Sequence, residues 1–364
     1  MLDANSIKSK PHYPILDGLR GVAAITVVLF HICEANSTGP YDQLINHGYL
    51  AVDFFFCLSG FVLPLAYEDR FRIDLSPLQF LRIRLIRLMP LIILATLVSA
   101  PYVLFRSHVN GIPLSDGELL VATGLGIINI PFLAASPAIG GPQVFPLNGP
   151  QYSLFLEVVV NVFWSISRRF YQPWSSVVVF VCCLAALPIV GLGGDEAATF
   201  WSGFPRVGAS FFAGVLIYHF ERRNPPSMDL RIVFWISAIA MAIIFYYPDS
   251  LPLTVHILWI AVVSPLVVWT GSRVRLQGKS RSIALLGGAL SYPIYALHYP
   301  IFCWVNGIYQ FATKRPQSIY FEGPLLFVAI LVGSYLLLRI FDEPLRYALS
   351  RATWIPGAVS RAKG

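Results

Sequence analysis

Eleven apolar segments, separated by short stretches that contain Pro, Gly or charged residues, run along the chain of 364 residues. Most of these segments have the length that an α-helix needs to cross a lipid bilayer. Hydrophobic residues make up 56% of the sequence and charged residues only 12%, which is not the composition of a soluble domain of this size. The segments lie at residues 15–35, 49–67, 89–106, 117–136, 150–168, 174–193, 204–220, 231–248, 252–271, 283–308 and 323–342. The sequence therefore predicts an all-α, polytopic transmembrane helix bundle.

The positions of the basic residues indicate which segments cross the membrane, because cytoplasmic loops carry an excess of Lys and Arg. Segment 117–136 contains Gly124, Gly126, Asn129 and Pro131, so we expect it to be re-entrant or non-spanning and the other ten segments to cross. With ten spans and both termini in the cytoplasm, 22 of the 26 Lys and Arg residues lie on the cytoplasmic side. The four others are Arg106, Arg206, Lys314 and Arg315. We then expect the irregular stretch 117–149 to line a cavity on the outer side.

Neither an internal repeat nor a soluble domain is evident in the sequence. Residues 1–364 are therefore expected to form a single membrane-embedded domain, with a core at about 14–345 and short cytoplasmic tails at both ends. A polar N-terminus followed by many apolar segments argues against a cleaved signal peptide. The five cysteines have no metal-binding spacing, so neither disulfides nor a metal site is predicted. The net charge of +7 is assigned to the loops and does not indicate nucleic-acid binding.

The first apolar segment carries an arginine, Arg20, and a histidine, His31, which lie eleven residues apart. Eleven residues make about three helical turns, so the two side chains share one face of the helix. Ionisable side chains within a membrane helix are costly, and they commonly mark a functional site. The alternative is that Arg20 reaches a lipid phosphate and that His31 bonds to a neighbouring helix.

The second segment combines an acidic residue, Asp53, with Ser59 and Gly60. A carboxylate inside a membrane needs a partner, and a contact of Asp53 with His31 or with an arginine would orient a catalytic base. The alternative is a structural ion pair between Asp53 and an arginine of the first spans. Gly60 lies on the same face as Asp53 and allows a neighbouring helix to approach closely.

Two arginines, Arg84 and Arg87, share one face where the third segment begins on the cytoplasmic side. Two adjacent guanidinium groups can bind a polyphosphate through charge-assisted hydrogen bonds. Arginines at this position also commonly contact lipid headgroups, which is the alternative interpretation.

Two further segments carry polar residues at helical spacing. Ser153 and Glu157 lie four residues apart in a helix that begins at Pro150, so Glu157 should face the interior and bind a substrate hydroxyl or a protein partner. In the segment at residues 283–308, three polar residues recur at successive turns, and two prolines distort the helix. These three residues are Ser291, Tyr295 and His298.

Taken in order, these motifs resemble those of the acyltransferase-3 family of integral-membrane O-acyltransferases over about residues 14–345. The motifs are an Arg and a His separated by ten residues, V-D-x-F-F-x-x-S-G-F from Val52, R-x-x-R-x-x-P from Arg84, S-L-x-x-E from Ser153 and S-Y-x-x-Y-x-x-H-x-P from Ser291. One departure is Tyr152, where the family usually has a tryptophan before the Ser-Leu pair. That part of an acceptor pocket is expected to differ in shape.

The resemblance implies transfer of an acyl group, usually acetyl, from acetyl-CoA or another acyl-CoA to a hydroxyl, with no permanently bound cofactor. It assigns His31 as the general base and Arg20, Asp53 and Ser59 as further catalytic residues. Arg84 and Arg87 would bind the phosphates of CoA. The acceptor side would comprise Glu157, Ser153, Ser291, Tyr295 and His298. A covalent acyl intermediate on His31 or Ser59 is an open alternative.

The resemblance also implies a bacterial cytoplasmic (inner) membrane location and contact with membrane lipid. The acceptor would be a glycan, a lipid-linked sugar or a small molecule that carries a hydroxyl, and the sequence does not distinguish among these or define an oligomeric state. A secondary transporter is the main alternative, because ten spans with broken helices and ionisable residues also describe transporters. The internal repeat expected of a transporter is not evident. A flippase for lipid-linked sugars is a related alternative.

Overall fold

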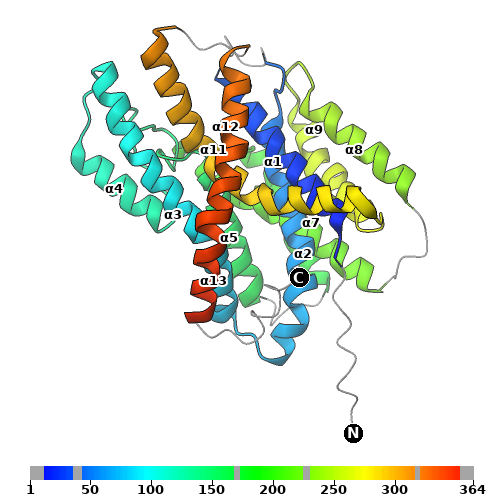
Figure 1. Ribbon diagram of the computed structural model, residues 1–364. Helices are drawn as coiled ribbons and strands as arrows, with labels where there is room; N and C mark the ends of the chain where they lie inside the picture. Colours follow the sequence, from blue (N-terminus) through cyan, green and yellow to red (C-terminus); the bar gives the residue numbers. More distant parts are fainter. Residues whose placement is uncertain (1–11, 36–42, 168–172, 224–229, 316–319, 353–364) are drawn as a thin grey trace.

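A computed structural model describes residues 12–35, 43–167, 173–223, 230–315 and 320–352. The predicted all-α fold is confirmed for these residues, which form a helix bundle (Figure 1) with one isolated β-bridge between Gln143 and Glu196. The helices are α1 (Pro14–Glu34), η1 (Gly48–Leu50), α2 (Ala51–Ile73), α3 (Pro77–Asn110), α4 (Asp116–Ile127), α5 (Gln151–Ser167), α6 (Pro173–Val190), η3 (Ala197–Ser202), α7 (Gly203–Arg223), α8 (Arg231–Phe245), α9 (Leu253–Leu258), η4 (Trp259–Val263), α10 (Ser264–Gly271), α11 (Gly278–Thr313), α12 (Glu322–Leu337), η5 (Leu338–Asp342) and α13 (Glu343–Ala352). Most of the two predicted tails lies outside the described residues.

Seven helical stretches within the described ranges are long and apolar enough to cross a membrane. They are Pro14–Glu34, Gly48–Ile73, Pro77–Asn110, Pro173–Val190, Ala197–Arg223, Leu253–Gly271 and Glu322–Ala352. The three other predicted spans coincide with α5, α8 and α11. Because α5 has 17 residues and α8 has 15, these two helices are short for a span, and the total of ten spans stays a prediction. The chain is an integral membrane protein.

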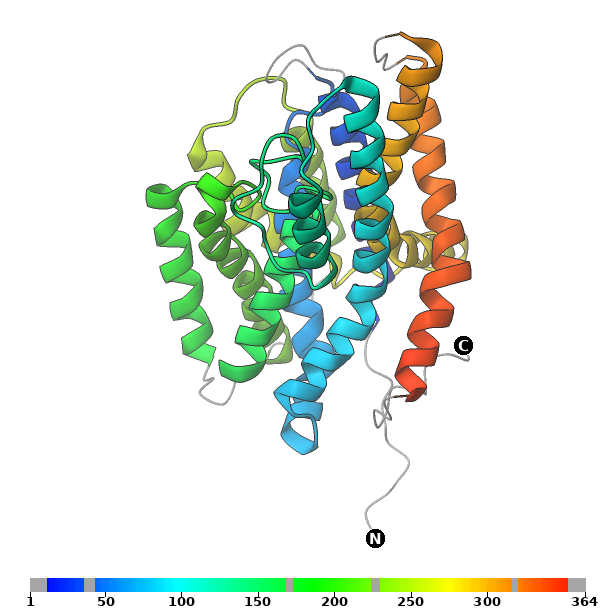
Figure 2. The same cartoon turned by 90° about the vertical axis from the view of Figure 1, so that its left-hand side faces the viewer.

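The segment that we expected not to cross the membrane forms the short helix α4 and an irregular stretch after it (Figure 2). Twelve residues of helix extend about 18 Å, which is less than the hydrocarbon thickness of about 30 Å. Both parts contact α5: the side-chain amide of Gln151 donates to the Gly126 carbonyl of α4 over 2.8 Å and to the Asn129 side chain of the irregular stretch over 3.2 Å. One pocket that this stretch lines is small, about 10 Å³, and the expected cavity on the outer side stays a prediction.

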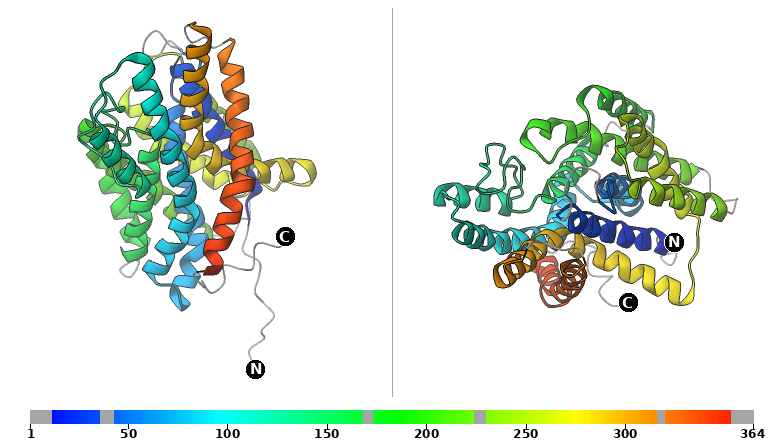
Figure 3. Two further views of the ribbon diagram at one scale, coloured as in Figure 1. Left: turned by 60° about the vertical axis from the view of Figure 1, so that its left-hand side comes forward. Right: turned by 90° about the horizontal axis from the view of Figure 1, so that it is seen from above.

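Helix α11 changes direction along its length. Its N-terminal part lies across the bundle, whereas its C-terminal part runs beside α12 (Figures 1 and 3). Pro293 and Pro300 lie within α11, and proline removes a backbone donor and bends a helix. The crossing part packs against α1 at Gly21 and Gly287, where a Cβ atom on Gly21 would lie 2.8 Å from the Gly287 Cα. Only glycine permits so close an approach of two helices.

Local sequence signals also position α3, which carries two of the predicted site arginines. The Ser76 side chain accepts a hydrogen bond from the Gln79 amide over 3.2 Å, and the Gln79 side chain accepts one from the Ser76 amide over 2.8 Å. This reciprocal capping box, together with Pro77 in the first turn, fixes the point at which α3 begins. Arg84 and Arg87 therefore lie in the second and third turns of the helix.

Candidate active site

Five helices converge on one cavity of about 230 Å³, which we call the central cavity. Its walls include eight of the eleven residues that the sequence analysis selected. These eight are Arg20 on α1, Ser59 on α2, Arg84 and Arg87 on α3, Ser153 and Glu157 on α5, and Ser291 and Tyr295 on α11. The structure thus brings together polar side chains that are up to 275 residues apart in the sequence.

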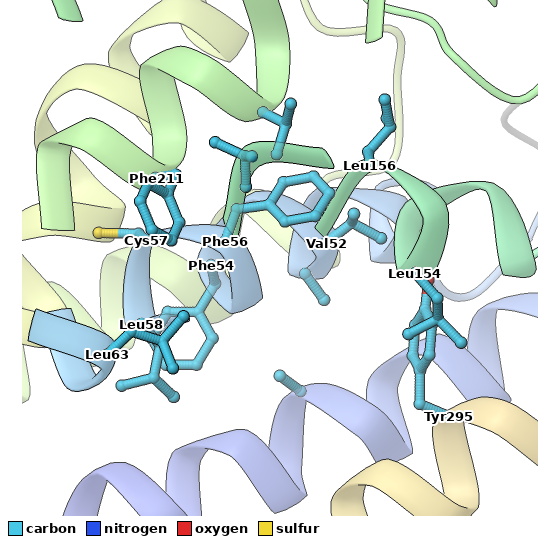
Figure 4. Packing of buried hydrophobic residues seen from close by; sticks show 14 of the residues in the cluster. Val52, Phe54, Phe56, Cys57, Leu58, Leu63, Leu154, Leu156, Phe211 and Tyr295 are labelled. Carbon is cyan, nitrogen blue, oxygen red and sulfur yellow. The ribbon is translucent and has the colours of Figure 1, made fainter. Parts of the chain in front are cut away.

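The central cavity is elongated. Its lining follows α2 from Val52 to Tyr67, which is about 22 Å of helix. Apolar side chains such as Phe55 and Leu63 line it, as do Val52, Leu154 and Tyr295, which are labelled in Figure 4. Val52 lies toward one end of this lining and Tyr67 toward the other. The shape suits a long and narrow molecule.

One of the two predicted arginines, Arg84, is bound by the protein. Its guanidinium is buried and forms an ion pair with the Glu157 carboxylate, which also accepts a hydrogen bond from the Ser59 hydroxyl over 3.3 Å. Glu157 therefore has a protein partner, as one of the two predicted alternatives required. A buried charge without such a partner would be strongly destabilising.

The second arginine, Arg87, is exposed at the cavity wall, one turn of α3 after Arg84. It has no ion-pair partner among the described residues. A guanidinium with free donors at the edge of a cavity can bind an anionic group of a ligand. Arg84 is therefore bound by the protein, whereas Arg87 is available to bind a ligand.

Arg20 connects α1 to the crossing part of α11. Its Nε donates to the Ser291 hydroxyl over 2.7 Å, and its Nη2 donates to the Gly288 carbonyl over 2.6 Å. Asp17, one turn earlier on α1, lies 3.5 Å from Nη2. Arg20 is therefore held by groups of the protein at the wall of the central cavity.

His31 and His298 lie side by side but do not line the central cavity. Their rings are stacked with centroids 5.2 Å apart and an interplanar angle of 24°. Tyr295 lies next to His298, with ring centroids 5.8 Å apart, and its hydroxyl is 2.6 Å from that of Ser153. The tyrosine therefore lies between the cavity and the two histidines.

The hydrogen bonds of the two histidines define which ring nitrogen is free. The Nδ1 of His31 lies 2.9 Å from Oε2 of Glu34, and the Nδ1 of His298 lies 2.7 Å from the Tyr295 carbonyl. Because a carboxylate and a carbonyl both accept, each Nδ1 carries a hydrogen, and in the neutral imidazole each Nε2 then has the lone pair. The Nε2 of His298 is buried and has no hydrogen-bond partner within the described part of the chain.

Glu34 is a site residue that the sequence analysis missed. It lies three residues after His31 on the same helix, and this spacing could have revealed it. Its position at the end of the apolar segment made it resemble an ordinary boundary residue.

Asp53 lies outside the central cavity, and its partner is an arginine rather than His31. Arg206 on α7 donates to its two oxygens over 2.9 Å and 2.8 Å, and the Ser210 hydroxyl donates over 3.3 Å. All three side chains are buried. Arg206 therefore lies near the start of α7 and is bound inside the protein, and its predicted position on the outer side of the membrane stays a prediction.

The family model described as an acyltransferase domain matches residues 13–339. The chain belongs to the acyltransferase-3 family. A Rhizobium radiobacter protein named Protein 2 in picA locus is 35% identical over 167 residues, which are 42% of this chain and 80% of that protein. The O-acetyltransferase OatA of Staphylococcus aureus strain NCTC 8325 is 24% identical over 382 residues, which are 92% of this chain and 58% of OatA. No solved structure matches the chain.

Family membership makes the chain a membrane-embedded acyltransferase and favours this class over a transporter or a flippase. An acyl donor and a hydroxyl acceptor are the substrate classes that the family implies. The chain spans about 60% of the length of the Staphylococcus aureus relatives that it matches.

Proposed function

We propose that this protein transfers an acyl group, in the simplest case acetyl, from an acyl-CoA to a hydroxyl of an exported acceptor. One observation supports this proposal most strongly. The central cavity is lined by the unpaired guanidinium of Arg87 and by Tyr295, whose ring lies next to that of His298, which in turn stacks on His31. This arrangement matches a donor with anionic phosphates, a long thin arm and a reactive thioester.

In this proposal Arg87 binds the phosphates of CoA, and Arg84 supports the charge of that end through its ion pair with Glu157. The pantetheine arm follows the apolar middle of the cavity. The thioester then reaches Ser153 and Tyr295, whose hydrogen bond we expect to open when the donor binds. We expect the end with Arg87 to face the cytoplasm, where acyl-CoA is made.

His31 acts as the general base in the proposed mechanism. Its Nε2 removes the proton from the acceptor hydroxyl, whose oxygen attacks the thioester carbonyl and forms the new ester bond while the carbon–sulfur bond breaks. The CoA thiolate then takes the proton from the imidazolium. Glu34 stabilises the charged imidazole and orients it. Arg20 is near enough to the cavity to stabilise negative charge on the thioester oxygen.

The remaining predicted residues take different roles in this mechanism. Asp53 keeps α2 and α7 together through Arg206 and does not touch the substrates. Ser59 donates to Glu157 rather than to a histidine, which favours direct transfer over an acyl-serine intermediate. His298 stacks on His31 and positions it.

The acceptor side of the proposal is coarser. We propose a bacterial inner membrane location, with both termini in the cytoplasm and a glycan, lipid-linked sugar or small hydroxyl compound as acceptor. The reported relatives include an O-acetyltransferase, which supports acetyl as the transferred group.

The decisive experiment compares cells of the source bacterium that carry the wild-type protein, no protein or the His31→Ala variant. Mass spectrometry of surface glycans and glycolipids should show one acetyl group fewer on the same species in the second and third cells. Purified protein should also turn over labelled acetyl-CoA only when His31 is present. Unchanged acylation in all cells together with no turnover would contradict the proposal, and a fully active variant would remove His31 as the base.

A further inference from the structure

A second cavity, of about 380 Å³, lies among loops at the other end of the bundle. We call it the loop cavity, and its polar lining residues are Tyr49, Tyr152, Asp195, Arg206 and His256. Tyr49 comes just before α2, whereas Tyr67 of the central cavity comes about 27 Å later along the helix. The volume lies within the range of binding sites for small ligands.

The charges in the loop cavity select against an anionic ligand. Arg206 is the cation of this cavity, and both its Nε and its Nη2 are bound to Asp53. Asp195 presents a carboxylate that has no hydrogen bond or ion pair to another described residue. A carboxylate accepts hydrogen bonds, so it suits a ligand that carries hydroxyl groups.

The aromatic residues of the loop cavity are held in fixed positions. The Tyr49 hydroxyl is 2.7 Å from the His256 Nε2, and the two rings are stacked with centroids 6.0 Å apart. The Tyr49 hydroxyl is also 3.2 Å from the Nδ1 of His47. Rigid aromatic side chains beside a hydrogen-bond acceptor form a surface that suits the faces and hydroxyls of a sugar ring.

The two cavities are separated by a thin layer of protein. Val52 lines the central cavity, and its neighbour Asp53 binds Arg206 of the loop cavity. On α5, Tyr152 lines the loop cavity, and its neighbour Ser153 lines the central cavity. Consecutive residues of α5 therefore line different cavities, and on α2 the residue after Val52 contacts a lining residue of the loop cavity, at the end where we place the thioester.

The central cavity provides no binding site for the acceptor that is separate from the proposed donor site. Four residues that the sequence analysis assigned to the acceptor side, Glu157, Ser153, Ser291 and Tyr295, line the same cavity as the arginines. A transferase that acts on two substrates needs a site for the second one. The loop cavity opens among the loops at the opposite end from Arg87.

We propose that the loop cavity binds a sugar unit of the acceptor, with Asp195 and Tyr152 contacting its hydroxyls. This inference rests on the proposed acyl transfer. The two substrates then enter from opposite ends of the bundle and meet at the layer between Val52–Asp53 and Tyr152–Ser153. Neither Asp195 nor the lining residue Leu251 takes part in the proposed donor site.

The test combines a filling variant and an isosteric variant, each with a matched neighbour. Leu251→Trp fills the loop cavity, and Ser250→Trp places the same side chain on the adjacent exposed residue. Asp195→Asn removes the charge, and Glu196→Gln removes that of the adjacent exposed carboxylate. For each protein, acetylation of surface glycans is measured in cells, and binding of CoA is measured on the purified protein by calorimetry.

We expect Leu251→Trp and Asp195→Asn to lower glycan acetylation at least tenfold, with the dissociation constant for CoA unchanged within twofold. Ser250→Trp and Glu196→Gln should acetylate as the wild type does. Normal acetylation by both loop-cavity variants would overturn the inference while the proposed function stands. If the wild-type protein itself acetylates no glycan, the proposed acyl transfer to a sugar fails, and the loop cavity loses its assignment with it.

Discussion

Two buried ion pairs join neighbouring helices of this bundle, and they differ in what surrounds them. Arg206 and Asp53 have side chains that are 4% and 0% exposed, and the carboxylate is bound through both of its oxygens. Arg84 is 6% exposed, but Glu157 is 20% exposed and faces the central cavity. The closed pair holds α2 against α7, whereas the carboxylate of the open pair faces the central cavity and can respond to a ligand there.

A third carboxylate extends the comparison. Glu34 is 54% exposed and binds the Nδ1 of His31. The three acidic residues therefore form a series from a sealed carboxylate, through one at a cavity wall, to one near the surface. Substitutions along this series should move from effects on stability to effects on catalysis and ligand binding.

The largest effect is expected for the sealed pair. Asp53→Ala leaves the Arg206 guanidinium buried without a counter-charge and should lower the free energy of unfolding by about 3–5 kcal/mol. Thermal unfolding of the protein in detergent measures this loss. Replacing both partners, as in Asp53→Leu with Arg206→Met, should restore most of the stability. A double variant as unstable as Asp53→Ala would show that the two charges do more than neutralise each other.

The exposed carboxylate should affect the rate without affecting stability. Glu34→Gln keeps the shape of the side chain but weakens its support of the charged imidazole, so kcat should fall about 10–100-fold. The KM for acyl-CoA should not change, and the same protein should unfold at the wild-type temperature. A rise in KM with a constant kcat would instead place Glu34 in substrate binding.

The next largest effect is expected for the unpaired guanidinium of Arg87. Arg87→Ala should weaken binding of CoA about tenfold, which corresponds to about 1.4 kcal/mol, because a charge-assisted contact is lost. Calorimetry on the purified protein measures this change, and Arg82→Ala, on the same helix and exposed away from the cavity, serves as the control. Equal affinity of the Arg87 variant and the control would return Arg87 to a contact with lipid headgroups.

The smallest effect should come from the open pair. Glu157→Gln retains a hydrogen-bond acceptor for Arg84 but removes the negative charge that faces its guanidinium. The free energy of unfolding should therefore fall by only about 1 kcal/mol. CoA should bind somewhat more tightly, since a second guanidinium becomes available to its phosphates. If this variant unfolds as readily as Asp53→Ala, the distinction between the two pairs is lost.

The sequence predicted the helices well because each depends on local composition. Apolar length predicted the positions of most long helices but not of α13 or of the start of α3, and helical spacing placed Ser153 and Glu157 on the wall of a shared cavity. The choice of partners between helices could not be predicted in this way. Arg206 lies 153 residues from Asp53, and only the packing of α2 against α7 brings the two together.

The direction of α11 was also beyond local patterns. Its segment was expected to be a span from residue 283, yet its first part lies across the bundle (Figure 3). The prolines predicted a distortion but not its size. The distance between His31 and the central cavity depends on this arrangement, and for that reason the sequence placed His31 at the centre of the site rather than behind Tyr295.

The glycine contact between α1 and α11 fixes how closely the two helices approach near Gly21. Arg20 lies beside this contact, and His31 lies ten residues after Gly21, or about 15 Å farther along α1. A rotation of about 5° at the contact would displace His31 by about 1.3 Å while leaving Arg20 almost in place. Misplacement of a reacting group by about 1 Å can cost about 100-fold in rate. The contact between Gly21 and Gly287 therefore helps to set the position of the imidazole of His31, the proposed base.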